Sequence, residues 1–579
     1  MALFEVWAPA ADRVRLQIDG QTHDLTTRDA GWWQAEIAAE HGADYLYLID
    51  DVGAALPDPR SRWQPHGVHG PSRHYDDTRY RWNDQAWTGR QLAGSVLYEL
   101  HVGTFTSEGT LAAAIERLDH LVELGIDIVE LLPLNAFDGE RGWGYDGVCW
   151  YAVHRAYGGP DALKQFVDAC HGRGLGVHLD VVYNHLGPSG AYLDRFGPYF
   201  TAARGTPWGP TLNLDGPGSD TVRRYLVDNA MMWLRDYHLD GLRLDAVHTL
   251  VDHRAVHVLE ELAIEIDALS THLGRPLSLV AESDLNEARL VTARDSAGYG
   301  LTAHWSDDFH HALHTVLTGE RQGYYADFGS LAALAKTLTR SYFHDGTWSS
   351  FRGRRHGRPV NTTATPAYRF LVYLQNHDQV GNRATGDRIG ASLSPGLLKV
   401  GAALVLTSPF TPMLFMGEEW AATAPWQFFT DYPEGTLSAA VRKGRRSEFA
   451  DHGWDANAIP DPQDEQTFVR SKVDWDSLDR PEHADLLDFY RRTIALRRQR
   501  PELSDPRLDL VSVDFSEESR WLVLARGGLR VVCNLAPQRQ TVPLDGAPQS
   551  LLLSSVSGFV YSEGQVELDG ESALVVELA

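Results

Sequence analysis

The segment 241–248, Gly-Leu-Arg-Leu-Asp-Ala-Val-His, carries a base and an acid two positions apart in an apolar run. Because side chains alternate between the faces of a strand, Arg243 and Asp245 are expected to share one face and the two leucines the other. A cation beside a carboxylate favours the ionised acid and fixes its direction. An ionised, oriented aspartate at the end of a buried strand is suited to covalent attack on a sugar carbon.

Three further apolar runs also end in polar side chains. These ends read Asp-Val-Val-Tyr-Asn-His at 180–185, Ala-Glu-Ser at 281–283 and Asn-His-Asp at 376–378. A retaining glycosidase needs two carboxyl groups roughly 5–5.5 Å apart, one that attacks and one that protonates the leaving oxygen. Glu282 has no cation beside it in the sequence, so desolvation is expected to keep it protonated near neutral pH. The contrast predicts Asp245 as the nucleophile and Glu282 as the acid.

Apolar strands that alternate with amphipathic helices are expected to position these groups. The strands are predicted at 96–100, 128–132, 175–182, 241–245, 277–282, 299–304, 369–375 and 411–416. Eight such units predict an α/β fold, a (β/α)8 TIM barrel with its active-site groups at the strand ends. An open doubly wound sheet is the alternative, but no glycine-rich phosphate-binding turn supports it.

Short strands flank the predicted barrel on both sides. Residues 1–90 are expected to form an N-terminal β-sandwich, with 81–90 as a polar linker. Residues 91–498 hold the catalytic barrel, and a Gly/Pro-rich loop insertion at 186–218 is long enough to suggest a functional loop. Residues 499–579 are expected to form a C-terminal antiparallel β domain.

The composition restricts the class of partner. The 52 basic and 78 acidic residues give a net charge of −26, which disfavours nucleic acid or an anionic membrane and suits a neutral ligand. No apolar run reaches membrane-spanning length, and the N-terminus has no signal-peptide pattern. The three cysteines form neither a disulfide framework nor a metal-ligand spacing. We therefore expect a cytoplasmic protein.

The four polar strand ends resemble, in order, the four sequence regions of the α-amylase superfamily of glycoside hydrolases. With the flanking β domains, the resemblance covers nearly the whole chain. It implies that Asp245 is the nucleophile, Glu282 the general acid/base, and Asp378 the carboxylate that stabilises the transition state. Asp180 is expected to hold Arg243 or its loop in place rather than to act on the substrate.

The resemblance also implies a set of substrate-binding residues. Tyr145, in the segment 143–146, would stack under the reacting sugar, and His185 and His377 would donate hydrogen bonds to its hydroxyls. The other predicted substrate contacts are Arg243, His248, Trp305, Asp307, Asp308, Gln379 and Asn382.

Three other segments narrow the expected substrate. The segments 282–289, 304–314, and 428–433 with 441–449 resemble trehalose-releasing hydrolases within the superfamily. The expected reaction is cleavage of the α-1,4 bond next to the terminal trehalose of maltooligosyl trehalose, with maltooligosyltrehalose synthase as pathway partner. Tyr432 departs from this pattern, because a histidine is expected there. Residues 442–446 are expected to form a solvated helix face, and 418–420 to line the outer cleft or cap a helix.

Two other functions remain open. A glucan branching enzyme, a transferase, uses the same four regions and would move a chain to a sugar hydroxyl instead of water. A non-catalytic glycan-binding protein would have no need of the complete set Asp245, Glu282 and Asp378. No metal and no cofactor are predicted, because the mechanism needs none and 186–218 holds no dense carboxylate cluster.

Overall fold

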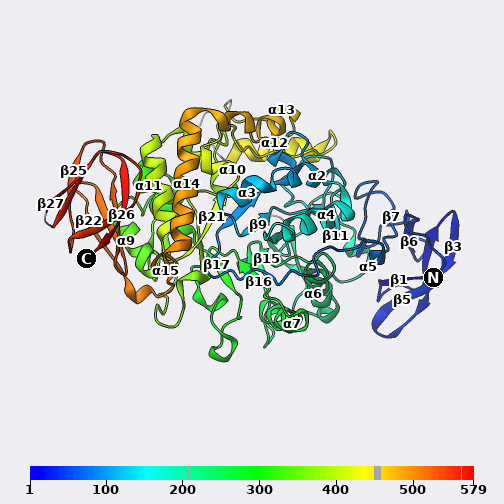
Figure 1. The fold of residues 1–579 in the computed structure, drawn as a ribbon. Coiled ribbons are helices and arrows are strands. Elements are labelled where there is room, and N and C mark those ends of the chain that lie inside the picture. The colour runs from blue at the N-terminus through cyan, green and yellow to red at the C-terminus, as the bar shows by residue number, and fades with distance from the viewer. Residues whose placement is uncertain (207–208, 449–457, 563) are drawn as a thin grey trace.

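A closed barrel of eight parallel strands forms the centre of the computed structural model, which describes residues 1–206, 209–448, 458–562 and 564–579 (Figure 1). In chain order the strands are β8 (Leu97–Leu100), β9 (Ile128–Leu131), β12 (Gly176–Val181), β15 (Gly241–Leu244), β16 (Ser278–Ala281), β17 (Ala303–Trp305), β20 (Phe370–Val372) and β21 (Thr411–Phe415). Pairing of β21 with β8 closes the barrel. The predicted TIM barrel is confirmed, although its sixth strand begins four residues later than expected.

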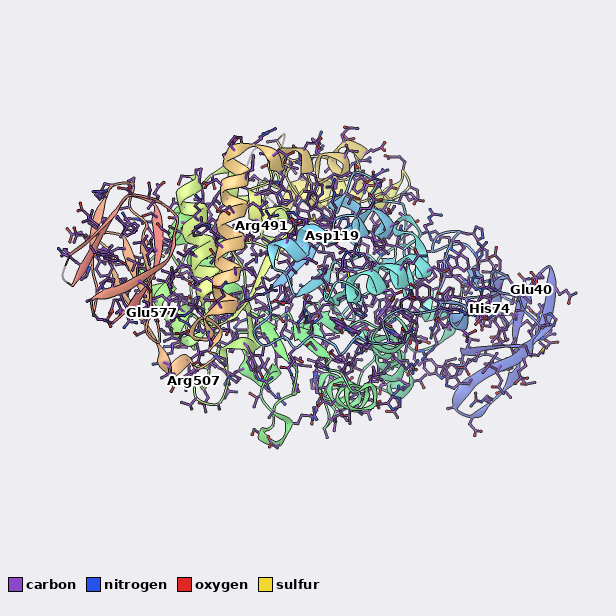
Figure 2. The ribbon with its side chains drawn as sticks, viewed as in Figure 1. Glu40, His74, Asp119, Arg491, Arg507 and Glu577 are labelled. Carbon is purple, nitrogen blue, oxygen red and sulfur yellow. The ribbon has the colours of Figure 1, made fainter. Side chains whose placement is uncertain are left out.

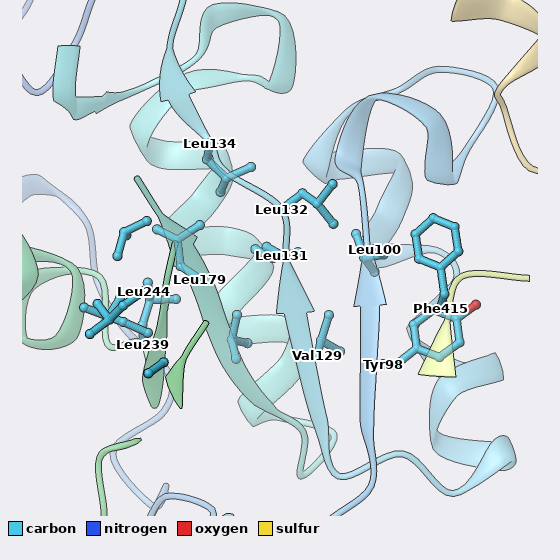
Figure 3. Close-up of a cluster of buried hydrophobic side chains, with 14 of the residues drawn as sticks. Tyr98, Leu100, Val129, Leu131, Leu132, Leu134, Leu179, Leu239, Leu244 and Phe415 are labelled. Carbon is cyan, nitrogen blue, oxygen red and sulfur yellow. The ribbon is translucent and has the colours of Figure 1, made fainter. Parts of the chain in front are cut away.

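In β8 and β9 side-chain alternation separates an apolar face from a face that carries a glutamate. Tyr98 and Leu100 of β8 lie near Val129 and Leu131 of β9 in a continuous cluster of buried side chains (Figure 3). The residues between them carry charge, and the register pairs Glu99 with Glu130. Side-chain alternation therefore points Glu99 and Glu130 into the barrel, on the same face as the apolar side chains of Leu97 and Ile128, while the other row packs outward.

Helices between the strands cover the barrel. Thr110 caps α2 (Leu111–Ile115) by accepting a hydrogen bond from Ala113 N–H, and Gly125 ends α3 (Leu118–Leu124) in a left-handed conformation. The longer helices are α4 (Gly159–His171), α6 (Ser219–Asp236), α7 (Val258–Leu273), α8 (Asp307–Thr318), α11 (Pro395–Thr407), α12 (Thr436–Glu448) and α14 (Pro481–Gln499).

Two antiparallel sheets form the N-terminal part. One orders β1 (Ala2–Trp7), β5 (Trp32–Ile37) and β4 (Thr26–Thr27); the other orders β3 (Gln21–Asp24), β2 (Val14–Ile18), β6 (Asp44–Ile49) and β7 (Ser72–Arg73). The linker 81–90 then lies against the barrel. In it, Trp87 donates a hydrogen bond to Asp240, and Asp84 contacts both His171 and His238.

The segment 186–218 is more ordered than a plain loop. It contains α5 (Leu193–Phe196) and the strands β13 (Phe200–Thr206) and β14 (Gly209–Leu212). Phe196 contacts the ring of Tyr47, and Tyr199 contacts that of Trp7. These aromatic contacts pack the segment against the N-terminal sheets, and its role as a functional loop stays a prediction.

Two antiparallel sheets also form the C-terminal part, at the opposite end of the molecule from the N-terminal sheets (Figure 1). The larger orders β22 (Val511–Ser516), β23 (Trp521–Arg526), β24 (Leu529–Asn534), β29 (Ser572–Leu578) and β26 (Pro548–Ser554). The smaller orders β25 (Gln540–Pro543), β28 (Gln565–Leu568) and β27 (Phe559–Ser562). Helix α11 packs between the larger sheet and the barrel.

The labelled charged side chains lie in all three parts of the molecule, from Glu40 in the N-terminal part to Glu577 in the C-terminal part (Figure 2). No helix among the described residues is long and apolar enough to cross a membrane. The domain boundaries near 90 and 498 stay predictions.

Candidate active site

A cavity of about 470 Å³ opens where the barrel strands end. Its wall is formed by residues from the segments that follow the barrel strands β9, β12, β15, β16, β20 and β21. The predicted residues on this wall are Tyr145, His185, Asp245, His248, Glu282, His377, Asp378 and Asn382. The barrel therefore gathers all three predicted catalytic carboxyl groups at one place.

The buried guanidinium of Arg243 joins three carboxyl groups. Its Nη1 lies 2.7 Å from Oδ2 of Asp180 and 2.8 Å from Oδ1 of Asp245, and its Nη2 lies 3.1 Å from Oε2 of Glu282. The predicted pairing with Asp245 is present, and Asp180 anchors the arginine from the neighbouring strand β12. The expectation that Glu282 has no adjacent cation was wrong, because Arg243 on β15 reaches across to the end of β16.

Asp245 is held in one direction through both carboxylate oxygens. Oδ1 accepts from Arg243, and Oδ2 accepts from the side-chain amide of Asn184 at 2.6 Å. The next residue, Ala246, adopts a left-handed conformation with φ of 41°, and its N–H donates to Oε2 of Glu282 at 2.6 Å. The turn after β15 thus positions the predicted nucleophile and the predicted acid together.

Glu282 is the strongly perturbed acid of the site. Burial raises its pKa to about 8, and the nearby charges of Asp245 and Asp378 act in the same direction. Arg243 and the N–H of Ala246 oppose the shift but do not outweigh it. Glu282 is therefore protonated near neutral pH, as a general acid must be.

His377 links the cavity wall to the barrel interior. Its Nε2 lies 2.8 Å from the hydroxyl of Tyr145, which itself donates to Oδ2 of Asp180 at 2.6 Å. Its Nδ1 lies 2.6 Å from Oε1 of Glu99, a residue that sequence reasoning missed. Burial lowers the pKa of His377, but Asp378 and Glu99 outweigh it and raise the value to about 9.

Two other histidines and an asparagine on the wall have distinct surroundings. His185 contacts Oδ1 of Asn184, and burial lowers its pKa. His248 accepts a hydrogen bond from the N–H of Asp284, and burial lowers its pKa as well. Asn382 donates to Oδ1 of Asp378 at 3.1 Å, so it orients that carboxylate.

Five predicted contacts do not lie on the wall of the cavity formed by the described residues: Arg243, Trp305, Asp307, Asp308 and Gln379. Trp305 is only 2% exposed, and the guanidinium of Arg243 lies 4.3 Å above its ring. Because β17 extends to 305, this indole packs in the barrel and supports the arginine instead of facing the solvent.

Asp307, Asp308 and Gln379 make hydrogen bonds within the protein instead of lining the cavity. Oδ1 of Asp307 accepts hydrogen bonds from Tyr373 and from the amide of Gln379. Asp308 accepts from the backbone N–H groups of Phe343 and His344, both at 2.8 Å. Burial raises the pKa of Asp308 to about 7.

One part of the wall comes from two loops that are bound to each other. Asp431 accepts hydrogen bonds from Arg141 at 2.6 Å and from the N–H of Glu140 at 2.8 Å, and Tyr432 donates to Asp146. Sequence reasoning singled out 428–433 and 441–449 but assigned no contacts there. The additional wall residues are Phe137, Asp138, Arg141, Gly142, Trp143, Gly144, Asp146, Ala246, Phe428, Thr430, Asp431, Tyr432 and Arg445.

The segments at 418–420 and 442–446 differ from expectation. Arg445 is 8% exposed, lies 5.1 Å from the ring centre of Phe428 and lines the cavity, so the expected solvated face was wrong at this position. Phe449, in the segment 441–449, lies outside the described residues. Glu418 and Glu419 are buried, where Glu419 contacts His120 at 2.8 Å and Glu418 accepts from Tyr490. They are not part of the cavity wall that the described residues form.

Within the described ranges, no group of three or more His, Cys, Asp and Glu side chains is placed to hold a metal ion. The absence of a metal in the mechanism stays a prediction.

Comparisons with known proteins agree with this geometry. Residues 71–199 match the family model "Alpha amylase, catalytic domain", and 506–575 match a "Domain of unknown function (DUF3459)". The malto-oligosyltrehalose trehalohydrolase of Mycobacterium tuberculosis is 56% identical over 549 residues, which cover 94% of each chain. That of Rhizobium sp. (strain M-11) is 55% identical over 580 residues, 99% of this chain and 97% of its own. A solved structure described as "Putative alpha Amylase from Salmonella typhimurium" superimposes with a TM-score of 0.91 at 39% identity, covering 100% of this chain and 97% of its own.

Proposed function

The chain belongs to the malto-oligosyltrehalose trehalohydrolase family of α-amylase-type glycoside hydrolases, and from this membership we propose how it releases trehalose. The substrate is maltooligosyl trehalose, and the bond cleaved is the α-1,4-glucosidic bond next to the terminal trehalose. The observation that carries the residue assignment is the single guanidinium of Arg243, which contacts both Asp245 and Glu282. Contact with one planar cation keeps the two carboxyl groups close, as retention of configuration requires.

In the first step, Asp245 forms a covalent bond to the anomeric carbon of the sugar. The bond from that carbon to the leaving oxygen breaks, and Glu282 gives its proton to the oxygen, so trehalose leaves neutral. The carboxylate of Asp378, oriented by Asn382, stabilises the positive charge that develops on the sugar ring.

In the second step, Glu282 is a carboxylate and acts as the base. It takes a proton from water, the water oxygen bonds to the anomeric carbon, and the bond to Asp245 breaks. The enzyme returns to its starting protonation state, and the shortened glucan leaves. Glu282 can thus act as the acid in the first step and the base in the second, because its pKa of about 8 lies close to neutral pH.

We assign the other wall residues to binding. The ring of Tyr145 stacks under the reacting sugar, and His185, His248 and His377 donate hydrogen bonds to hydroxyls. Trp305, by contrast, supports Arg243 from below.

Product analysis after incubation with maltooligosyl trehalose tests this function. We expect free trehalose, a glucan shortened by that unit, and no new α-1,6 linkage. New α-1,6 branch points would instead identify a branching enzyme. The high identity to trehalohydrolases over nearly the whole chain favours hydrolysis over that alternative.

We also propose that the protein works in the cytoplasm after maltooligosyltrehalose synthase, which would supply its substrate. Cys149, Cys170 and Cys533 are buried and free, which suits a reducing compartment. Cell fractionation tests the compartment. A coupled assay tests the partner, because linear maltooligosaccharides should yield trehalose only when both proteins are present.

A further inference from the structure

A glutamate from the first barrel strand holds the ring of His377 from behind. Oε1 of Glu99 lies 2.6 Å from Nδ1 of His377, and Oε2 accepts a hydrogen bond from the backbone N–H of the same histidine at 2.9 Å. Both side chains are buried, with exposed fractions of 2% for Glu99 and 1% for His377. Because the backbone N–H can only donate, Oε2 accepts, and this leaves Oε1 as the oxygen that faces Nδ1 of the ring.

The hydrogen-bond partners of His377 call for a proton on each ring nitrogen. With Asp180 ionised, as its ion pair with Arg243 favours, Tyr145 donates its one hydroxyl proton to Oδ2 of Asp180 at 2.6 Å and accepts from Nε2 of His377 at 2.8 Å. That contact needs an N–H at Nε2. The carboxylate of Glu99 needs an N–H at Nδ1. A ring with both protons is an imidazolium cation.

The charges around the histidine agree with this count. Asp378 lies 3.6 Å from Nε2, Glu99 contacts Nδ1, and Asp180 lies behind Tyr145. On the opposing side are the cation of Arg243 and the ring of His101. The negative groups prevail, since the pKa of His377 is raised to about 9 despite its burial.

We propose that Glu99 is a positioning residue for the hydrolysis, which keeps His377 an imidazolium whose Nε2–H donates to Tyr145 in the free enzyme and to a sugar hydroxyl once substrate fills the cavity. A charged donor makes a shorter and roughly twice stronger hydrogen bond to a sugar hydroxyl than a neutral one. The contribution to hydrolysis rests on the proposed function, whereas the charge of His377 is a property of the free enzyme.

Nitrogen NMR of the free, full-length enzyme labelled with 15N-histidine tests the charge directly. The His377 signals are assigned by their loss in His377→Gln. At pH 7.5 we expect both ring nitrogens of His377 to show the shifts of an imidazolium, and in Glu99→Gln those of a neutral ring. Glu130→Gln is the matched control, because Glu130 is equally buried and pairs in register with Glu99 on β9. It should leave His377 charged.

The pH dependence of kcat/KM tests the role in hydrolysis. In Glu99→Gln the alkaline limb should move at least about one pH unit toward acid, because His377 then loses its proton before Glu282 does. Activity at pH 8 should fall about tenfold and recover at pH 6, whereas Glu130→Gln should keep the original limb.

Three results would overturn the proposal. The first is a neutral His377 in the unaltered enzyme at pH 7.5, a result that does not depend on how Glu99→Gln folds. The second is a His377 that stays charged in Glu99→Gln, and the third is an unmoved alkaline limb in that variant. A failure to release trehalose would refute the proposed function instead, and it would leave the NMR result standing.

Discussion

Nη2 of Arg243 lies 3.1 Å from Oε2 of Glu282, so the proposed general acid faces a cation. The two residues come from the adjacent strands β15 and β16, whose register brings their ends together. A cation at this distance favours the ionised acid, yet burial and two carboxylates raise the pKa of Glu282 to about 8. The arginine therefore moderates the acid and keeps its proton transferable.

Replacement of Asp245 by asparagine should remove hydrolysis without unfolding the protein. The amide cannot form the covalent bond to the sugar, so kcat should fall by about ten-thousand-fold or more. Arg243 keeps its ion pair with Asp180, and the melting temperature should stay within a few degrees. Trehalose release and thermal unfolding measure the two effects. Residual activity above one-hundredth would contradict the assignment.

The alkaline limb of kcat/KM should lie near pH 8. Glu282 donates a proton in the first step, and its protonated fraction falls tenfold per pH unit above a pKa of about 8. A rate profile between pH 5 and 10 locates the limb. A maltooligosyl fluoride serves as control, because fluoride leaves with little protonation, so its limb should move from pH 8 toward pH 9, where His377 loses its proton. An identical limb for both substrates would exclude Glu282 as the source.

Glu282→Gln should stabilise the fold increasingly as pH rises. The pKa of Glu282 is raised from 4.5 to about 8 on folding, so between those values the folded protein holds a proton that the unfolded chain releases. The unfolding free energy of the unaltered protein therefore falls as pH rises through this window. Glu282→Gln has no proton to lose at this position, so its unfolding free energy does not fall for this reason. The gain in unfolding free energy should grow from pH 5 to pH 8, to at most about 5 kcal/mol.

Denaturant titrations at pH 5, 6.5 and 8 measure this gain. Glu123→Gln, at an exposed position on α3, is the control and should show no pH-dependent difference. A gain from Glu282→Gln that is equal at all three pH values would refute the linkage.

Arg445→Ala should weaken substrate binding. Arg445 lies beside Phe428 on the cavity wall and donates a hydrogen bond to the carbonyl of Gly381 without touching Asp245 or Glu282, so KM should rise about tenfold with a smaller change in kcat. Arg446→Ala is the matched control, because Arg446 is exposed. Michaelis curves for the two variants decide the matter. Equal KM values would mean that Arg445 makes no contact with the substrate.

The sequence predicted most of the barrel strands and helices because the patterns that indicate them lie within short segments. Apolar runs identified the strands, and caps such as Thr110 and Gly125 identified the ends of the helices between them. Parallel strands in a barrel all end at the same rim. The convergence of Asp245, Glu282 and Asp378 followed from topology. Contacts between distant positions left no such signal: Glu99 and His377 lie 278 positions apart. Likewise, nothing in the sequence distinguishes Arg445, which lines the cavity, from the other charged residues of its helix.

The sequence by itself determined which chemical groups the barrel would bring together, because strand alternation and strand order are properties of short segments and their succession. The tertiary structure alone decided what state those groups are in. Whether Glu282 keeps its proton depends on its burial and on the sum of the charges of Arg243, Asp245 and Asp378 around it. Whether Trp305 faces a sugar or supports Arg243 depends on where its strand ends. Both are set by three-dimensional neighbours, which a linear sequence does not specify.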